Sequence, residues 1–165
     1  MKNSTSTDVD DVTDIVLAYV ACSEGMDFAT RKSLWDPAEA TPVLCPEEAP
    51  EPLIGWDALD AYWSRSRETM ASLKTKATKI RVRLLGEELA LASYQSRWIA
   101  TLSQTGHLPE KPISADVRMN AVLRRTADGW RYIHLVEGPV DLMTMARQAA
   151  TRSALALFPD MTPTD

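Results

Sequence analysis

The chain has 165 residues, of which 45% are hydrophobic and 25% are charged, and its formal net charge is −5. This length indicates one domain with a full hydrophobic core, and the composition excludes a disordered chain or a coiled coil. An acidic chain lacks the broad positive field that nucleic acid or an anionic membrane attracts, so neither is expected as a partner.

Three helices are predicted in the first part of the chain. The first has Ser6 or Thr7 as its N-cap, carries one apolar stripe and ends at Gly25. The second is short and spans residues 27–35. The third begins at Gly55, and its apolar face is expected to hold Trp56, Leu59, Tyr62, Trp63, Met70 and Leu73.

Residues 36–54 separate the second helix from the third. They contain five of the ten prolines and four glutamates, which predicts an irregular loop interrupted by one short strand at 41–45. Such a loop forms either the rim of a pocket or a solvated connection.

Beyond residue 78 the apolar period changes from helical to alternating, which predicts antiparallel strands. Strands are expected near 79–84 and at 89–102, 116–125 and 130–137, with Asp128-Gly129 as the last hairpin turn. Helices that precede such a sheet indicate an α+β fold. The curved antiparallel sheet would wrap around the N-terminal helices and form a cone with an internal pocket.

The expected organisation is a single domain at residues 8–140. A disordered N-terminus at 1–7 precedes it. A C-terminal helix at 141–158, packed on the domain, and a tail at 159–165 follow it.

A family resemblance rests on three stretches of sequence. Residues 122–134, VLRRTADGWRYIH, resemble the final hairpin of the SnoaL-like branch of the nuclear transport factor 2-like superfamily. Residues 27–35, 43–46 and 55–59 follow that family's order of an Asp-led short helix, a short strand ending in proline and a Gly-led helix. The resemblance covers about residues 8–140 and implies the cone fold. It implies no single activity, because this fold carries isomerases, cyclases, dehydratases, epoxide hydrolases and non-catalytic dimerisation domains.

The ketosteroid isomerases of this superfamily allow a comparison by residue. Tyr19 stands eight residues before Asp27, as the oxyanion-hole tyrosine of those enzymes precedes its aspartate. The position of their catalytic carboxylate holds Cys45, and their second oxyanion donor falls near Asn120. A thiol is a poorer base than a carboxylate at neutral pH, so the resemblance does not extend to that activity.

Alternation along the strands, oriented by the resemblance, assigns the residues that face the cone. In the last strand Ile133, Leu135 and Glu137 are expected inside and Trp130, Tyr132 and His134 outside. The interior face of the two preceding strands is expected to hold Gln95, Arg97, Ile99, Arg118, Asn120 and Val122. The residues expected to bind a ligand are Trp35, Cys45, Trp63, Ile99, Arg118, Ile133 and Leu135.

The candidate catalytic residues are Glu137, Tyr19, Asn120 and Arg97. Glu137 is the carboxylate expected inside, and an apolar cone would raise its pKa into the range of a general base. The other three would stabilise an oxyanion on a flat hydrophobic carbonyl compound during proton transfer, hydration or dehydration, without a cofactor. An isomerase, cyclase or lyase of SnoaL-like type is therefore expected.

Two alternatives remain open. Arg97 and Glu137 could neutralise each other as a buried pair. Independently of that pair, the domain could be a non-catalytic module that binds a small hydrophobic or aromatic molecule or mediates dimerisation.

Aromatic side chains expected on the outer face of the sheet, Tyr94, Trp98, Trp130 and Tyr132, predict a homodimer that covers them. No metal site is expected, because the two histidines lack supporting cysteine or histidine spacing. The absence of a long apolar run and of a signal-like start, together with only two cysteines, predicts a cytoplasmic protein.

Overall fold

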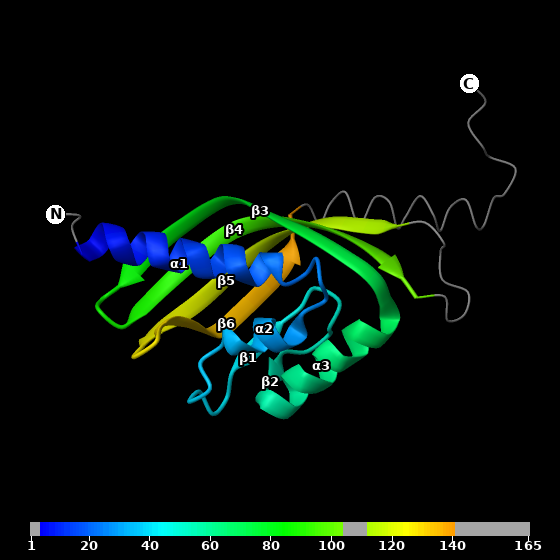
Figure 1. Ribbon diagram of the computed structural model, residues 1–165, viewed down its shortest axis with the longest axis horizontal. Coiled ribbons are helices and arrows are strands. Elements are labelled where there is room, and N and C mark those ends of the chain that lie inside the picture. The colour runs from blue at the N-terminus through cyan, green and yellow to red at the C-terminus, as the bar shows by residue number, and fades with distance from the viewer. Residues whose placement is uncertain (1–3, 104–111, 141–165) are drawn as a thin grey trace, which may run out of the picture.

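The computed structural model describes residues 4–103 and 112–140 (Figure 1). The elements of this part of the chain are α1 (Ser4–Ala21), α2 (Phe28–Ser33), β1 (Val43–Cys45), β2 (Leu53–Ile54), α3 (Trp56–Thr69), β3 (Met70–Leu85), β4 (Leu89–Leu102), β5 (Ile113–Thr126) and β6 (Gly129–Pro139).

The strands form one six-stranded sheet in the order β2-β1-β6-β5-β4-β3. The four long strands β3 to β6 pair antiparallel with their chain neighbours, whereas the short β1 pairs parallel with β6. The sheet is curved and unclosed, with α1 lying across it and α2 and α3 at the end that carries β1 and β2 (Figure 1). The α+β cone fold is thus confirmed.

Several predicted boundaries differ from the structure. The first helix begins at Ser4 and ends at Ala21, before Gly25. The second follows an Asp27 N-cap, whose Oδ1 accepts a hydrogen bond from the Thr30 amide at 2.9 Å. The edge strand β2 was not predicted, and the predicted C-terminal helix at 141–158 lies outside the described residues.

The third helix is shorter than predicted. It ends at Thr69, and the chain enters β3 at Met70 without a loop. Met70 and Leu73, expected on the helix, therefore belong to the strand. The sequence hid this change of structure because both residues also fit the helical spacing that precedes them.

Two irregularities in strand pairing change which residues face the interior. In β3 the register shifts between Thr78 and Arg81, where Lys79 has a φ of +55°. In β6 Leu123 pairs with Tyr132 while Val122 pairs with His134, so Ile133 is an extra, bulged residue. A bulge shifts the alternation of side chains by one position. The faces on its two sides therefore cannot be read from one continuous alternation.

The face assignment of β4 and β5 was wrong. Glu137 pairs with Met119, so the set of β5 side chains that includes Met119 faces the interior, not the set that includes Asn120. The buried residues of the two strands are Ala90, Ala92, Tyr94, Ser96, Ala100, Val117, Met119, Ala121 and Leu123. The residues expected inside, Gln95, Arg97, Ile99, Arg118, Asn120 and Val122, alternate with these and lie on the opposite face.

The bulge in β6 also places aromatic rings inside. Trp130 and Tyr132 are 2% and 0% exposed, and Tyr132 packs against Tyr19 of α1 with ring centroids 4.8 Å apart. Tyr94 is buried and Trp98 lies half-buried against the core. The prediction of an aromatic outer face is therefore wrong. The homodimer was predicted from that face, so this argument for it no longer holds.

An ion-pair cluster holds the start of the 36–54 loop on the sheet. Arg124 of β5 donates to Asp36 Oδ2 at 2.9 Å and to Glu39 Oε2 at 2.8 Å, and the Asp36 side chain is 4% exposed. The Asp36 amide also donates to the Tyr132 carbonyl at 2.9 Å. The loop leaves this anchor, forms β1 and returns toward the interior of the sheet at Glu47.

Candidate functional site

A pocket of about 240 Å³ lies between α1 and the interior face of β3 to β6. Its apolar walls are formed by Val20, Met70, Leu73, Ala100, Leu102, Ile113, Val117 and Met119. Its polar lining consists of Tyr19, Ser23, Arg31, Glu47, Glu48, Tyr62, Thr75, Tyr94, Ser96, Trp98 and Glu137. A mostly apolar concavity of this size with converging polar groups suits a small organic molecule of one or two rings.

Glu137 lines this pocket from near the end of β6. The pKa of its carboxyl is raised from 4.5 to about 8, chiefly by burial and in smaller part by the nearby Glu48 and Glu47 carboxylates. The Arg31 guanidinium opposes this shift without cancelling it. At neutral pH the Glu137 carboxyl is therefore mostly protonated, with a reactive ionised fraction that grows as the pH rises.

Tyr19 enters the pocket from the last turn of α1 and is 5% exposed. Burial raises its pKa well above the ordinary value of 10, so the hydroxyl stays neutral and can donate a hydrogen bond at any physiological pH. The charge of ionised Glu137 also raises the pKa of Tyr19. The structure thus brings together two of the four candidate catalytic residues.

Arg31 of α2 is the cationic side chain of the pocket, in place of the predicted Arg97 and Asn120. Its guanidinium lies 4.9 Å from the Tyr19 ring centroid, and its Nη2 donates to the Ser23 hydroxyl at 2.5 Å. Its Nε is buried and has no hydrogen-bond partner among the described residues. Sequence reasoning missed Arg31 because a single arginine on a short polar helix carries no periodic signal.

The loop after β1 contributes two further carboxylates, so Glu137 is not alone inside. Trp98 Nε1 donates to Glu47 Oε1 at 2.9 Å, and the Tyr62 hydroxyl donates to Glu48 Oε1 at 2.7 Å. Burial raises the pKa of Glu47, which the Trp98 hydrogen bond partly offsets. Of the alternatives left open for this loop, the structure favours a pocket wall.

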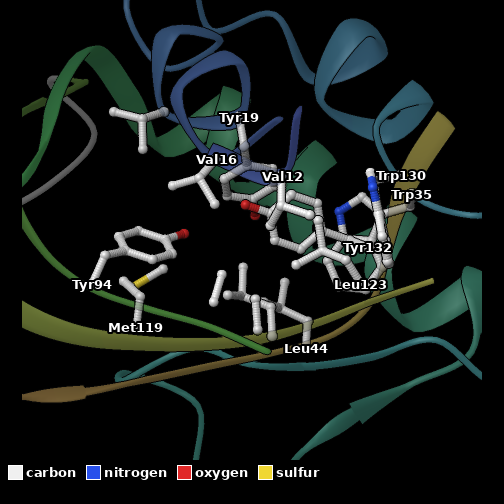
Figure 2. Packing of buried hydrophobic residues seen from close by; sticks show 14 of the residues in the cluster. Val12, Val16, Tyr19, Trp35, Leu44, Tyr94, Met119, Leu123, Trp130 and Tyr132 are labelled. Carbon is white, nitrogen blue, oxygen red and sulfur yellow. The ribbon is translucent and has the colours of Figure 1, made fainter. Parts of the chain in front are cut away.

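Tyr94 faces Tyr19 from β4. Figure 2 shows its hydroxyl pointing across the interior toward Tyr19. Tyr94 is 3% exposed, and burial raises its pKa. Its hydroxyl makes no well-formed hydrogen bond with any described residue, the neighbouring Tyr132 hydroxyl included. Such a buried, unsatisfied hydroxyl is costly unless a bound molecule or water pairs with it.

Arg97 and Asn120, the other two candidate catalytic residues, lie on the outer face. Arg97 pairs with Asp116, its Nη2 lying 2.6 Å from Oδ2, and both side chains are about half exposed. The Asn120 carbonyl oxygen accepts a hydrogen bond from Ser93 at 2.9 Å. The expected buried pair of Arg97 with Glu137 does not form, because the two side chains lie on opposite faces of the sheet.

The residues expected to bind a ligand are scattered, and none of them lines the pocket. Trp35, Trp63 and Leu135 belong to the buried core, and the rings of the two tryptophans pack 6.1 Å apart. Ile99 and Arg118 are exposed on the outer face, and Ile133 is the bulged residue of β6. Cys45 lies on β1 opposite Val136.

A signal for the correct face was present in the sequence. Tyr94 and Trp98 stand on the same side of β4 and alternate with the polar Gln95 and Arg97, and Val117 and Met119 alternate with Asp116, Arg118 and Asn120 on β5. On a half-buried strand the apolar set faces the core. If the more apolar of the two alternating sets on β4 and on β5 had been assigned to the interior, the pocket wall would have been predicted correctly.

No helix of the described residues is long and apolar enough to cross a membrane. Within the same residues, no group of three or more histidine, cysteine, aspartate or glutamate side chains is arranged to hold a metal ion.

Comparison with solved structures identifies the same fold. A protein from Streptomyces avermitilis, provisionally assigned as a dehydratase of the NTF2-like family, aligns with a TM-score of 0.70 and 23% identity over 82% of this chain and 97% of its own. An NTF2-like superfamily protein from Salmonella enterica aligns with a TM-score of 0.71 and 18% identity over 84% and 96% of the two chains. A ketosteroid isomerase-like protein from Erwinia carotovora gives a TM-score of 0.66 and 15% identity over 81% and 97%.

A search of curated proteins found no match. Residues 12–140 match the model of the SnoaL-like domain, which covers most of the chain and all the elements that build the pocket except the start of α1. The chain therefore belongs to the SnoaL-like family.

Proposed function

We propose that this protein is a cofactor-independent enzyme that moves a proton on a small, uncharged, largely apolar carbonyl compound. The observation that carries the proposal is the Glu137 carboxyl, which lines an apolar pocket beside Tyr19 and has a pKa raised to about 8. A general acid or base works best when its pKa lies near the working pH, and a surface glutamate does not meet this condition. Isomerisation and dehydration both begin with such a transfer.

The roles follow from the geometry of the pocket. Ionised Glu137 takes a proton from the carbon next to the carbonyl, and the negative charge moves onto the carbonyl oxygen. The neutral Tyr19 hydroxyl, which lines the same pocket, is the donor that would stabilise this oxygen. Arg31 supplies a positive charge close to Glu137. Its Nε, which has no hydrogen-bond partner among the described residues, is a further donor. Arg97 and Asn120, which lie on the outer face, have no part in this scheme.

Deuterium exchange tests the proposal without knowledge of the natural substrate. Flat cyclic ketones such as indanone are incubated with the protein in D₂O, and loss of the protons next to the carbonyl is followed by NMR. We expect catalysed exchange whose rate rises with pH and levels off above about 8, because only ionised Glu137 accepts a proton. If a ketone binds in the pocket but its exchange is no faster than in buffer, the alternative of a non-catalytic binding module is favoured. The apolar walls of the pocket are consistent with that alternative.

Tyr19→Phe tests the oxyanion donor. The phenylalanine ring keeps the packing against Tyr132 and Arg31 but lacks the hydroxyl. We expect exchange to slow about tenfold to a hundredfold, somewhat less than the full loss of an oxyanion donor, because Arg31 remains. Ketone affinity and thermal unfolding should stay close to those of the unmodified protein. An unchanged rate would mean that the oxygen binds elsewhere.

A further inference from the structure

One carboxylate oxygen of Glu47 makes no hydrogen bond with any described residue. Its Oε1 is fixed by the Trp98 indole N–H at 2.9 Å, while its Oε2 is buried and has no hydrogen-bond partner among the described residues. Glu47 lines the pocket, and Glu48, the neighbouring acid, is already engaged by Tyr62. The fixed carboxyl therefore presents one open acceptor position.

A second polar group of the same pocket also lacks a well-formed hydrogen bond. Tyr94 lines the pocket and is 3% exposed, and its hydroxyl, although it lies next to that of Tyr132, makes no well-formed hydrogen bond with a described residue. The described residues therefore leave a buried acceptor and a buried hydroxyl in one cavity, which is unfavourable unless a guest completes their hydrogen bonds. A carbonyl group alone cannot do this for the ionised form of Glu47, because a carboxylate accepts hydrogen bonds and does not donate them.

The charged side chains around the pocket also restrict the charge that a bound molecule can carry. Arg31 is the one basic side chain among the described residues that line it, whereas Glu47 and Glu48 are acidic and Glu137 is mostly protonated at neutral pH. A carboxylate or phosphate on the ligand would be repelled, since like charges in a partly buried site disfavour each other. The guest that fits these groups is uncharged and carries a hydrogen-bond donor.

We propose that the substrate is a hydroxylated cyclic carbonyl compound whose hydroxyl donates to Glu47 Oε2, so that Glu47 is a specificity-determining residue and Trp98 its positioning residue. This inference deepens the proposed function, because it names the substrate class of the same pocket. The carbonyl end of the molecule then lies toward Tyr19 and Glu137.

Paired ligands test the inference. The dissociation constants of indanone, of a hydroxyindanone and of an indanone carboxylate are measured by calorimetry. We expect the hydroxyl compound to bind at least tenfold more tightly than indanone, because a hydrogen bond to a charged acceptor is one of the stronger kinds. The carboxylate should bind at least tenfold more weakly than indanone.

Variants at Glu47 then assign the preference to one atom. In Glu47→Gln the Trp98 N–H keeps the amide oxygen at the Oε1 position, so an NH₂ donor replaces the open acceptor. We expect the preference for the hydroxyl to fall about tenfold while indanone affinity stays within threefold. Glu47→Met should remove the preference entirely, and the exposed Glu51→Gln on the same loop should change nothing. Trp98→Phe should lower the ratio of hydroxyindanone affinity to indanone affinity, because the Glu47 carboxyl is no longer held.

The outcomes separate this inference from the proposed function. Equal affinities for indanone and hydroxyindanone, a preference that survives in Glu47→Gln, or failure of both compounds to bind would overturn the substrate class. The proposed function fails on a different result, namely that bound indanone shows no catalysed deuterium exchange.

Discussion

Glu137→Gln is expected to lower the rate of deuterium exchange in a bound ketone by about a hundredfold to ten-thousandfold. Glutamine has nearly the shape of a protonated glutamic acid but cannot accept a proton. The residual exchange should no longer rise with pH near 8, because that rise reports ionisation of the Glu137 carboxyl. The measurement is the NMR exchange rate from about pH 6 to about pH 9, at ketone concentrations that saturate the pocket.

Glu87→Gln is the matched control for this experiment. Glu87 lies exposed in the turn between β3 and β4, so the variant makes the same chemical change outside the pocket. Its exchange rate and pH profile should equal those of the unmodified protein. If Glu137→Gln retains the full rate and profile, Glu137 is not the base, and Glu47 becomes the carboxyl to examine.

The sequence predicted the overall architecture better than it predicted the site. The helix stripes, the hairpin turn at Asp128-Gly129 and the antiparallel order depend on local patterns that a single sequence contains. Tyr19 and Glu137 line the pocket, as predicted, but that prediction also used the family resemblance, which pointed to Tyr19 and oriented the alternation of β6. One sits on the apolar stripe of α1, and the other lies two residues beyond the buried Leu135 on β6.

The errors in the site have one physical origin. Alternation along a strand gives faces only relative to one another, and a bulge resets it. Extending a single alternation through Ile133 placed Tyr132 outside. The same step put Asn120 and Arg97 on the face of Glu137, whereas the residue opposite Glu137 is Met119. The pairing register across strands is a long-range property, which local patterns do not encode.

Arg31 and Glu47 illustrate a different limit. Both come from short or irregular segments, α2 and the proline-rich loop, whose path depends on tertiary anchors such as the Arg124–Asp36 pair. Their side chains reach the pocket only because those anchors fold the segments back over the sheet. Residues of this kind can be found from coordinates but not from periodicity.

The raised pKa of Glu137 also predicts how stability depends on pH. The folded protein holds a proton on this carboxyl up to about pH 8, whereas the unfolded chain releases it near the ordinary value of 4.5. Between these two values the folded state binds more protons, so the contribution of Glu137 to the free energy of unfolding falls as the pH rises. Below about pH 4.5 the group is protonated in both states and has no effect.

Glu137→Gln removes this titration and should therefore stabilise the protein in alkali. The amide of the variant resembles the protonated acid, so the two proteins should unfold at nearly the same urea concentration near pH 4.5. At pH 9 the variant should be more stable by on the order of 3 kcal/mol, which is below the full value of the pKa difference because Glu137 is partly accessible. Glu87→Gln should follow the unmodified protein at both pH values. Parallel curves for Glu137→Gln would show that the carboxyl is ordinary in the folded state. A gain in alkali combined with lost exchange would instead mean that burying this acid destabilises the fold while giving it the pKa that proton transfer requires.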